Sequence, residues 1–260
     1  MDIQVYLSEF TSDWRLSGRS AATVGIYCAY VRELTSDMSV EDIGLTNVKQ
    51  WLADSPSPET ARYRARAVRA FGRWAAENDG PSWPWAGSVP LASVHPKPQP
   101  TVSHDEYRAV LSRAVSLRDR AVVELLWATG MRVSELARVN VEDIDLAGGF
   151  VVIPRSKTGK PRVVPLTEAA VRLCRRQIGV RAQGSLLGMT SHAVQLLLRR
   201  LDSPSPHAWR RGWAVQALRA GVSEASVRAA AGWSSGAMVA RYTSAVSGEL
   251  AIAEFRRAQH

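Results

Sequence analysis

Apolar residues in the first 80 positions recur at spacings of three and four, which is the repeat of amphipathic α-helices. The segments with this repeat are 3–14, 20–34, 46–53 and 58–78. Ser57 and Pro58 are typical of a helix start, with serine as the N-cap and proline in the first helical position. We therefore predict that this part of the chain is entirely helical.

The pattern changes to short β-branched runs in "GGFVVIPR" and "PRVVPL", which flank the glycine-containing loop "SKTGK". This arrangement predicts two antiparallel strands joined in a hairpin. Around it the helical repeat continues: Ser103 and Glu106 form a capping box, and Gly130 is a typical helix stop. Helices are predicted over 103–116, 118–129, 167–178, 191–201, 207–221, 223–232, 236–242 and 248–259.

Residues 86–103 contain four prolines and show no periodicity, which indicates an extended linker. We predict a mainly α protein with a helical domain over 1–87, a Pro-rich linker over 88–102, and a second domain over 103–260. The second domain is expected to be mainly helical with a small antiparallel β-sheet.

The positive charge is concentrated in the second part of the chain. Residues 1–95 hold 9 Lys/Arg and 11 Asp/Glu, a net −2, whereas residues 96–260 hold 24 and 13, a net +11, which together give the total of +9. This distribution suggests a polyanionic partner such as nucleic acid, with a merely basic domain as the alternative. Two distant cysteines, no long apolar run and an acidic, amphipathic start predict a cytoplasmic protein without a membrane span or signal peptide.

The predicted helix over 58–78 carries two stripes when its residues are placed at 100° intervals. The apolar stripe consists of Tyr63, Ala67, Phe71 and Trp74. The basic stripe consists of Arg62, Arg66, Arg69 and Arg73. No acidic residue lies between Thr60 and Ala76, so the basic stripe is predicted either to contact a DNA backbone or to be a solvated face.

Motifs for common cofactors are missing from the sequence: it has no P-loop, no GxGxxG after a strand, no HExxH and no Cys/His set at ligand spacing. The adjacent Glu142 and Asp143 lie in a turn-like segment, which argues against a two-metal nuclease. We expect no metal and no other cofactor. Cations at the ends of predicted elements are the candidates for chemistry: Arg132, Lys157, His207 and Arg210.

These cations fall in four motifs within residues 103–245: "ATGMRVSEL", "SKTGKPRVVPL", "HAWR" and "AGWSSGAMVARYT". In this order they resemble the arginine motif, lysine hairpin, His-x-x-Arg box and nucleophile segment of the tyrosine recombinases, also called phage integrases. The resemblance implies a helical core-binding domain that clamps DNA, followed by a catalytic domain. It implies an active site of Arg132, Lys157, His207, Arg210, Trp233 and Tyr242.

The chemistry of these residue types fits attack on a phosphodiester. Guanidinium groups match phosphate oxygens bidentately, so Arg132 and Arg210 are expected to clamp the scissile phosphate. Lys157 would protonate the departing 5′ oxygen as general acid, with Lys160 as the competing candidate. His207 would take part in proton transfer, or else be a histidine at a helix start without a role.

Tyr242 is the expected nucleophile, giving a 3′-phosphotyrosyl link without ATP or metal; its phenol, with a pKa near 10, needs the dense cations of the site. Trp233 stands where the family more often has histidine. Its indole N–H can only donate, so it would hold the phosphate or the tyrosyl group. Glu135 would orient nearby cations from behind, or be an exposed carboxylate.

The resemblance predicts a site-specific recombinase or integrase of a phage or mobile element, acting on double-stranded DNA at a specific crossover site. It also implies a bacterial protein that is nucleoid-associated when bound to DNA. Because core-binding-like helices begin almost at Met1, recognition of the crossover site alone is expected. Arg199 and Arg200 mark the candidate groove-facing helix. The tail helix over 249–258 would pack onto a neighbouring protomer in a synaptic tetramer, or onto its own domain. The alternatives are a topoisomerase IB-like relaxing enzyme and a catalytically inactive DNA-binding regulator.

Overall fold

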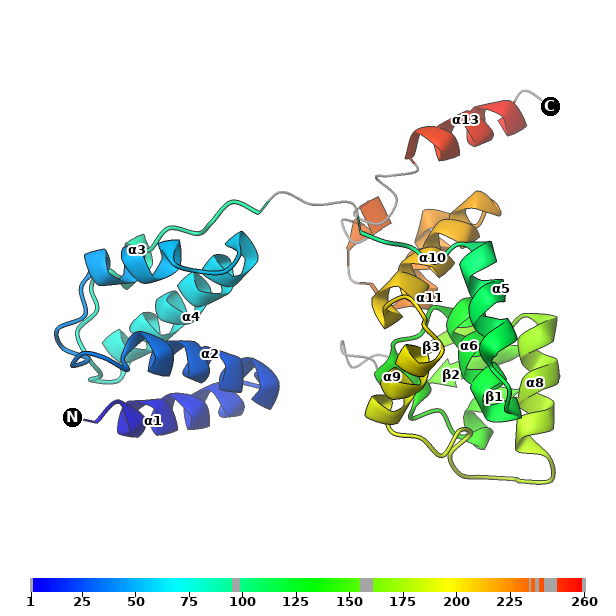
Figure 1. The fold of residues 1–260 in the computed structure, drawn as a ribbon, viewed down its shortest axis with the longest axis horizontal. Coiled ribbons are helices and arrows are strands. Elements are labelled where there is room, and N and C mark those ends of the chain that lie inside the picture. Colours follow the sequence, from blue (N-terminus) through cyan, green and yellow to red (C-terminus); the bar gives the residue numbers. More distant parts are fainter. Residues whose placement is uncertain are drawn as a thin grey trace. The chain divides into compact units, whose positions relative to one another are not determined.

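A computed structural model describes residues 2–94, 99–154, 161–233, 235–236, 239–240 and 247–258 of the chain (Figure 1). The chain divides into two compact units, Met1–Pro96 and Lys97–His260. The division lies in the Pro-rich segment. No helix in the described part is both long enough and apolar enough to cross a membrane.

The first unit is helical throughout its regular structure, as its periodicity predicts. Its helices are α1 (Ile3–Leu16), α2 (Ala21–Leu34), α3 (Leu45–Ala53) and α4 (Pro58–Glu77), followed by a 3₁₀ turn, η1 (Ala86–Ser88). The predicted start of α4 is confirmed, because the Ser57 side chain accepts a hydrogen bond from the Thr60 amide and Pro58 occupies the first turn. Aromatic rings fill the core: Phe71 lies edge-on to both Phe10 and Trp83, with ring centroids 5.6 and 5.1 Å apart.

The apolar stripe predicted on α4 is confirmed at Ala67, Phe71 and Trp74, which are buried, and is wrong at Tyr63, which is 52% exposed. Arg64 takes the buried position instead. Its guanidinium pairs with Glu33 of α2 and lies 4.5 Å from the centroid of the Trp51 ring of α3. An arginine can lie at the edge of a core when its charge is paired and its stem is covered. Tyr63 is consequently turned to solvent.

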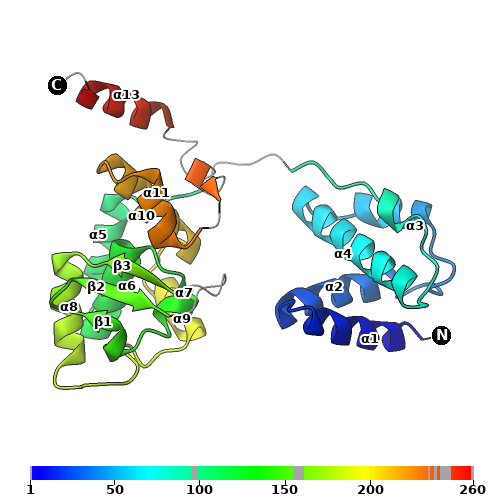
Figure 2. The ribbon, with the colours of Figure 1, turned by 180° about the vertical axis from the view of Figure 1, so that it is seen from behind.

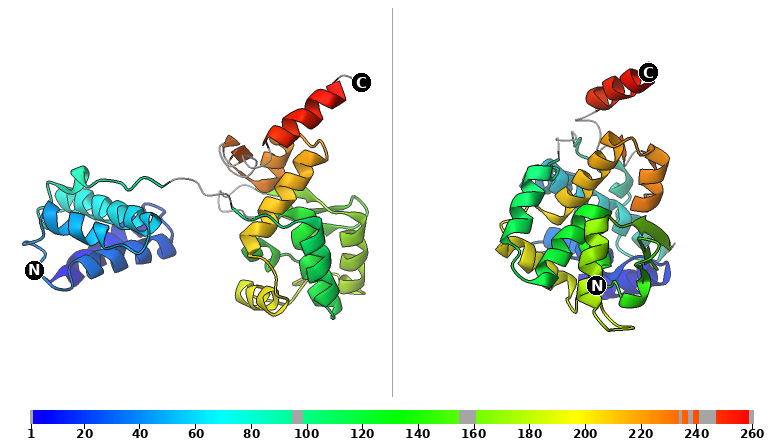
Figure 3. Two further views of the ribbon diagram at one scale, coloured as in Figure 1. Left: turned by 45° about the horizontal axis from the view of Figure 1, so that its top comes forward. Right: turned by 90° about the vertical axis from the view of Figure 1, so that its right-hand side faces the viewer.

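In the second unit, the other elements pack around the buried helix α6. Figures 1 and 2 show α6 between α5, α8 and the strands, and Figure 3 shows α10 beside α11. The described helices are α5 (His104–Arg113), α6 (Leu117–Thr129), α7 (Val133–Leu136), the 3₁₀ turn η2 (Val141–Asp143), α8 (Glu168–Ile178), α9 (Ser191–Arg200), α10 (Pro206–Arg219), α11 (Glu224–Ala231) and α13 (Ser247–Ala258). The strands are β1 (Ile144–Asp145), β2 (Phe150–Ile153) and β3 (Arg162–Pro165).

The sheet is antiparallel in the order β1-β2-β3, with Val151 opposite Val164 in the central pair. The two predicted strands are confirmed as β2 and β3. The strand β1 was not predicted, because two residues are too few to show an alternation. The expectation of a mainly α protein with a small antiparallel sheet is confirmed. The predicted hairpin loop 156–160 and most of the predicted helix 236–242 lie outside the described residues.

The turn between α6 and α7 is fixed by a glycine. Gly130 ends α6, as predicted, with a positive φ of 57°. A Cβ atom at this position would lie 2.6 Å from the ring of Trp213 on α10, so α10 packs directly against the turn. Positive φ and this close approach both require glycine. The capping box of Ser103 and Glu106 at the start of α5 is also confirmed.

The tail helix α13 is joined to α10 by an ion pair between Glu249 and Arg219, with 2.8 Å between Oε2 and Nη2. Ile252 and Phe255 are 56% and 72% exposed. Part of the apolar face of this helix is therefore uncovered within the chain.

Candidate active site

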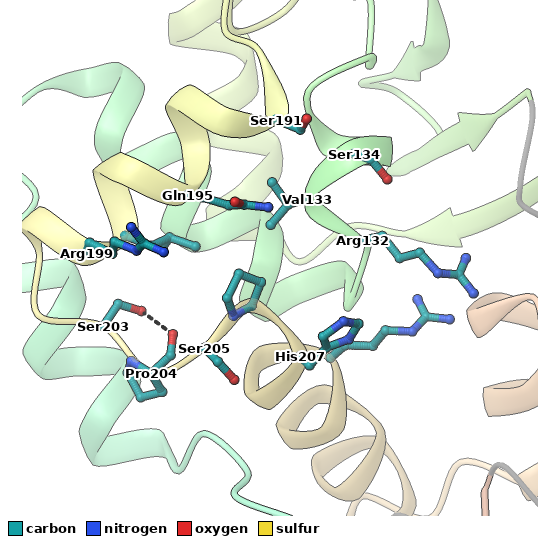
Figure 4. A pocket seen from close by; sticks show the side chains of 13 residues that line it. Arg132, Val133, Ser134, Ser191, Gln195, Arg199, Ser203, Pro204, Ser205 and His207 are labelled. Atoms are coloured by element: carbon teal, nitrogen blue, oxygen red, sulfur yellow. Dashed lines mark hydrogen bonds between the residues drawn. The ribbon is translucent and has the colours of Figure 1, made fainter. Parts of the chain in front are cut away.

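A pocket of about 530 Å³ lies in the second unit, where the start of α7, one face of α9 and the start of α10 meet. Three of the predicted catalytic residues, Arg132, His207 and Arg210, line it together with Arg199. Figure 4 shows Arg132 and His207 at one end of the view and Arg199 at the other. The structure thus brings together cations separated by up to 78 positions.

Arg132 is placed by the turn that Gly130 makes possible. It has extended backbone angles and immediately precedes α7. Glu135, in the first turn of α7, accepts hydrogen bonds from the Arg132 amide at 2.8 Å and from its Nη1 at 2.7 Å. The Arg132 side chain remains 28% exposed. Its guanidinium is therefore held from behind while part of it still reaches the pocket.

Arg210 is held by main-chain carbonyl groups at two helix ends. Its Nη1 donates to the Gly130 carbonyl at 2.8 Å, and its Nη2 donates to the Ala231 carbonyl at the end of α11. The side chain lies in the second turn of α10, where the residue is only 4% exposed. These contacts set the plane of the guanidinium relative to the turn that carries Arg132.

Trp233 follows the glycine that ends α11. Gly232 has a positive φ of 65°, and the Trp233 amide donates to the Arg228 carbonyl at 3.0 Å. The indole ring is buried in an apolar cluster with Trp213 and Val227, and its centroid lies 5.1 Å from Arg210 Cζ. Trp233 therefore packs against Arg210, and it is not among the residues that line the pocket. Its hydrogen bond to substrate remains a prediction.

His207 lies in the first turn of α10, after the N-cap Ser205. Partial burial and the charges of Arg211, Arg210 and Arg132 lower the pKa of the imidazole below its ordinary value. Each of these effects disfavours the protonated ring. At neutral pH the neutral ring is therefore favoured, with one nitrogen able to accept a proton and the other able to donate one.

Glu135 is buried between two arginines, which excludes the exposed alternative. Arg162 of β3 donates to both of its oxygens, Nη1 to Oε1 at 3.0 Å and Nη2 to Oε2 at 2.7 Å. Burial acts to raise the pKa of the Glu135 carboxyl, but the hydrogen bonds from Arg162 and the Arg132 amide hold this pKa below its ordinary value. Glu135 is thus an ionised acceptor behind Arg132.

Arg162 was not singled out from the sequence, although a signal was present. In a strand, alternate side chains share one face, so Arg162 lies on the same face as Val164. Val164 is fully buried, and Arg162 is 9% exposed. An arginine on the inner face of a predicted strand indicates a buried partner for its charge, such as a carboxylate. The sequence could not identify Glu135 as that partner, because 27 residues separate the two.

The predicted DNA-binding arginines differ in their contacts. Arg199 is exposed and lines the pocket, whereas Arg200 pairs with the buried Asp119 of α6 at 2.8 Å. In the first unit, Arg69 donates to the Val89 carbonyl at 2.8 Å and Arg62 to the Ala92 carbonyl at 3.5 Å. The other two members of the basic stripe, Arg66 and Arg73, are exposed.

Lys157, the competing Lys160 and Tyr242 lie outside the residues that the structure describes. Of the tyrosines that the structure describes, none lines the pocket. The described part of the chain contains no group of three or more His, Cys, Asp and Glu residues that could hold a metal ion. Cys28 and Cys174 are both buried, and neither forms a disulfide.

The model of the phage integrase family matches residues 101–248, which is more than half of the chain. The chain belongs to the phage integrase family. Its membership of the tyrosine recombinases, predicted from four motifs, is thereby confirmed. The match covers α5 to α11 and hence the whole pocket described above.

Relatives and solved structures agree with this family. The chain is 29% identical to tyrosine recombinase XerC of Corynebacterium glutamicum, over 93% of this chain and 87% of the relative. It is 24% identical to tyrosine recombinase XerA of Saccharolobus solfataricus, over 80% and 77%. A lambda integrase dimer bound to a core site shares the fold with a TM-score of 0.77 and 18% identity, over 92% of this chain and 97% of that one.

Proposed function

We propose that this phage integrase family member is a site-specific DNA recombinase that cuts and rejoins double-stranded DNA through a 3′-phosphotyrosyl intermediate on Tyr242. The observation that supports the proposal most is the meeting of Arg132, His207 and Arg210 in one pocket of a chain that belongs to this family. Three cationic or proton-transferring side chains on one cavity fit a phosphodiester substrate.

The first step exchanges one phosphorus–oxygen bond for another. The Tyr242 oxygen, which gives up its proton, attacks the scissile phosphorus and forms a new P–O bond. The bond from phosphorus to the 5′ oxygen breaks, and Lys157 donates a proton to that oxygen. Religation reverses these events when the 5′ hydroxyl of a partner strand attacks the phosphotyrosine. The number of phosphoester bonds is unchanged, so the cycle balances without ATP.

Arg132 and Arg210 act where negative charge develops, on the non-bridging oxygens of the phosphate. Their positions are set beforehand by Glu135 and by the Gly130 and Ala231 carbonyls, so little reorganisation is required during the reaction. The neutral imidazole of His207 can accept the tyrosyl proton or donate a hydrogen bond to a phosphate oxygen. Trp233 supports Arg210 through its ring.

The DNA partner and the assembly follow from charge and from the solved structures. Residues 96–260 carry a net charge of +11, with 24 basic and 13 acidic residues. Among the proteins with this fold is a lambda integrase tetramer bound to a Holliday junction, with a TM-score of 0.74. We propose a tetramer on two crossover sites of a phage or mobile element, with the exposed face of α13 available to a neighbouring protomer.

Covalent trapping tests this proposal. Sites are first selected by binding of the protein to a randomised duplex library and are then placed in nicked duplexes that lose the 5′ hydroxyl fragment after cleavage. The wild-type chain should form an adduct that survives denaturation. Arg210→Lys should slow its formation by about 10²–10³-fold, as expected when an electrostatic interaction with the transition state is removed.

Arg172→Lys is the matched control, because Arg172 of α8 pairs with Glu168 and does not line the pocket. It should form the adduct at close to the wild-type rate. DNA affinity at several salt concentrations is measured for all three proteins, and Arg210→Lys should keep most of it. Equal losses of affinity and of adduct in Arg210→Lys would contradict a catalytic role for Arg210.

A further inference from the structure

Arg162 is a buried cation to which the proposed mechanism gives no role. It opens β3, and its side chain is 6% exposed. Nη1 and Nη2 donate to the two oxygens of Glu135, and Nε donates to the Ala230 carbonyl at 2.8 Å. One guanidinium thus joins a strand, the helix α7 and the end of α11.

Each of these contacts leads to a residue of the candidate site. Glu135 holds the amide and Nη1 of Arg132. Ala230 precedes Ala231, whose carbonyl accepts the hydrogen bond from Arg210, and Trp233 follows two residues later. Arg162 itself follows Lys157 by five residues and is the first residue of β3. Two segments of the candidate site that are distant in sequence therefore share one guanidinium.

We propose that Arg162 is a positioning residue that fixes the Arg132 turn and the α11–Trp233 segment relative to one another. It acts through Glu135 and the Ala230 carbonyl and does not line the pocket. The proposal rests on the proposed recombinase function. The strand β3 thereby holds together the Arg132 turn and the end of α11, whose carbonyl group binds Arg210.

The Arg162 side chain passes close to the glycine that ends α11. A Cβ at Gly232 would lie 3.1 Å from Arg162 Cδ, so the glycine that ends α11 lets the side chain pass. A planar guanidinium can bind the two carboxylate oxygens and a carbonyl together, because its donors point in different directions in one plane. A lysine ammonium can keep the charge beside Glu135 but cannot reproduce this bidentate geometry.

Loss of Arg162 should produce a change in pH dependence that a loss of stability alone would not. Burial acts to raise the pKa of Glu135, and the hydrogen bonds from Arg162 oppose it. Without Arg162 this pKa should rise, so Glu135 becomes protonated as the pH falls. A neutral Glu135 holds Arg132 less firmly. The cleavage rate of such a variant, divided by that of wild type, should therefore decrease as the pH falls.

The experiment compares the full-length variants Arg162→Met and Arg162→Lys with wild type. Single-turnover cleavage of the nicked duplex is measured at saturating protein, well below each melting temperature. Arg162→Met should cleave about 10–100-fold more slowly, the usual effect of removing a partner that orients a reacting group, with DNA affinity within about threefold of wild type. Arg162→Lys should be slowed less, and its rate ratio should not vary with pH, because the charge beside Glu135 is kept.

Two further variants separate positioning from folding. In the double variant Glu135→Gln with Arg162→Met, the rate ratio should lose its pH dependence, because the titrating carboxyl is gone. Arg181→Met is the matched control: Arg181 also donates to main-chain carbonyls, those of Ile178 and Ser185, and does not line the pocket. It should alter stability and leave the cleavage rate at the wild-type value.

Wild-type rates in both Arg162 variants would overturn the proposal, as would a rate loss in Arg181→Met equal to that in Arg162→Met. If Arg162→Met does not fold, a wild-type rate in Arg162→Lys alone is sufficient to overturn it. Absence of an adduct in wild type would instead contradict the proposed function, so the two failures are distinguishable.

Discussion

At the scale of single residues, the site is a group of cations whose charges act on one another. His207 is surrounded by Arg132, Arg210 and Arg211, and burial adds to their effect in lowering the pKa of its ring. Glu135 offsets part of this charge, but it contacts Arg132 and Arg162, not His207. A bound phosphate would place negative charge next to these cations. Substrate binding should therefore raise the pKa of His207.

The titration of His207 is a direct prediction. In the free protein its imidazole signals should titrate below pH 6.5, and Arg132→Gln should move the midpoint upward because one neighbouring charge is removed. The folded state then binds fewer protons than the unfolded state around pH 6, so this residue lowers stability as the pH falls through 6.5. Proton NMR, with His207→Gln to assign the signals, measures the midpoint. Titration at or above 6.5 would contradict the electrostatics described here.

At the scale of elements, α4 carries arginines of two kinds within one basic stripe. Arg62 and Arg69 hold the carbonyl groups of Ala92 and Val89, so they fix the chain that leaves this unit. Arg66 and Arg73 are exposed. The sequence predicts the stripe but not this division, because the segment that returns along α4 has no periodic signal.

Paired substitutions should separate the two kinds. Replacing Arg66 and Arg73 by Gln should lower the slope of log affinity against log salt by about 1.8, since each phosphate that an arginine neutralises contributes about 0.9, and should leave the melting temperature unchanged. Replacing Arg62 and Arg69 by Gln should lower the melting temperature by a few degrees, because two hydrogen bonds are removed. If the two double variants give the same salt slope and the same melting temperature, the division of the stripe into two kinds of arginine is refuted.

The sequence could predict those parts of the fold that local signals determine. Ser57, Ser103 and Gly130 mark helix ends because capping and positive φ are properties of a few neighbouring residues. Tyr63 was misplaced because Glu33 and Trp51, from other helices, decide which side of α4 is buried. The strand β1 was too short to give an alternation.

The candidate site divides in the same way. Arg132, His207 and Arg210 could be named because their motifs have a fixed order, and the structure places them on one pocket. The partners of Arg162 could not be named, because Glu135 and Ala230 lie 27 and 68 positions away. Motif order thus indicated which side chains meet, while the buried contacts that hold them required the folded chain.

At the scale of the whole molecule, the opposite net charges of the two parts of the chain suggest different contributions to DNA binding. Residues 1–95 are slightly acidic, with 9 basic and 11 acidic residues, and residues 96–260 hold the excess of positive charge. The second part should supply most of the salt-dependent affinity, with the first adding a local contact through α4. Recombination requires in addition that two DNA sites meet.

Strand transfer between two duplexes distinguishes a recombinase from a relaxing enzyme. Two differently labelled duplexes carrying the selected site should yield products that join both labels, and the yield should increase with protein concentration as protomers assemble. The topoisomerase IB-like alternative predicts relaxation of a supercoiled plasmid and no joined product. The inactive-regulator alternative predicts neither reaction.

The proposed covalent link between Tyr242 and DNA is tested most directly by finding the residue that becomes linked to DNA. The chain has six tyrosines, and Tyr107 is a poor candidate because burial and its hydrogen bond to Glu124 raise the pKa of its phenol. The trapped adduct is digested with protease and nuclease, and the modified peptide is sequenced by mass spectrometry. We predict a nucleotide attached through its 3′ phosphate to Tyr242, and no adduct in Tyr242→Phe. A nucleotide on any other residue, or an undiminished adduct in Tyr242→Phe, would contradict the proposed mechanism.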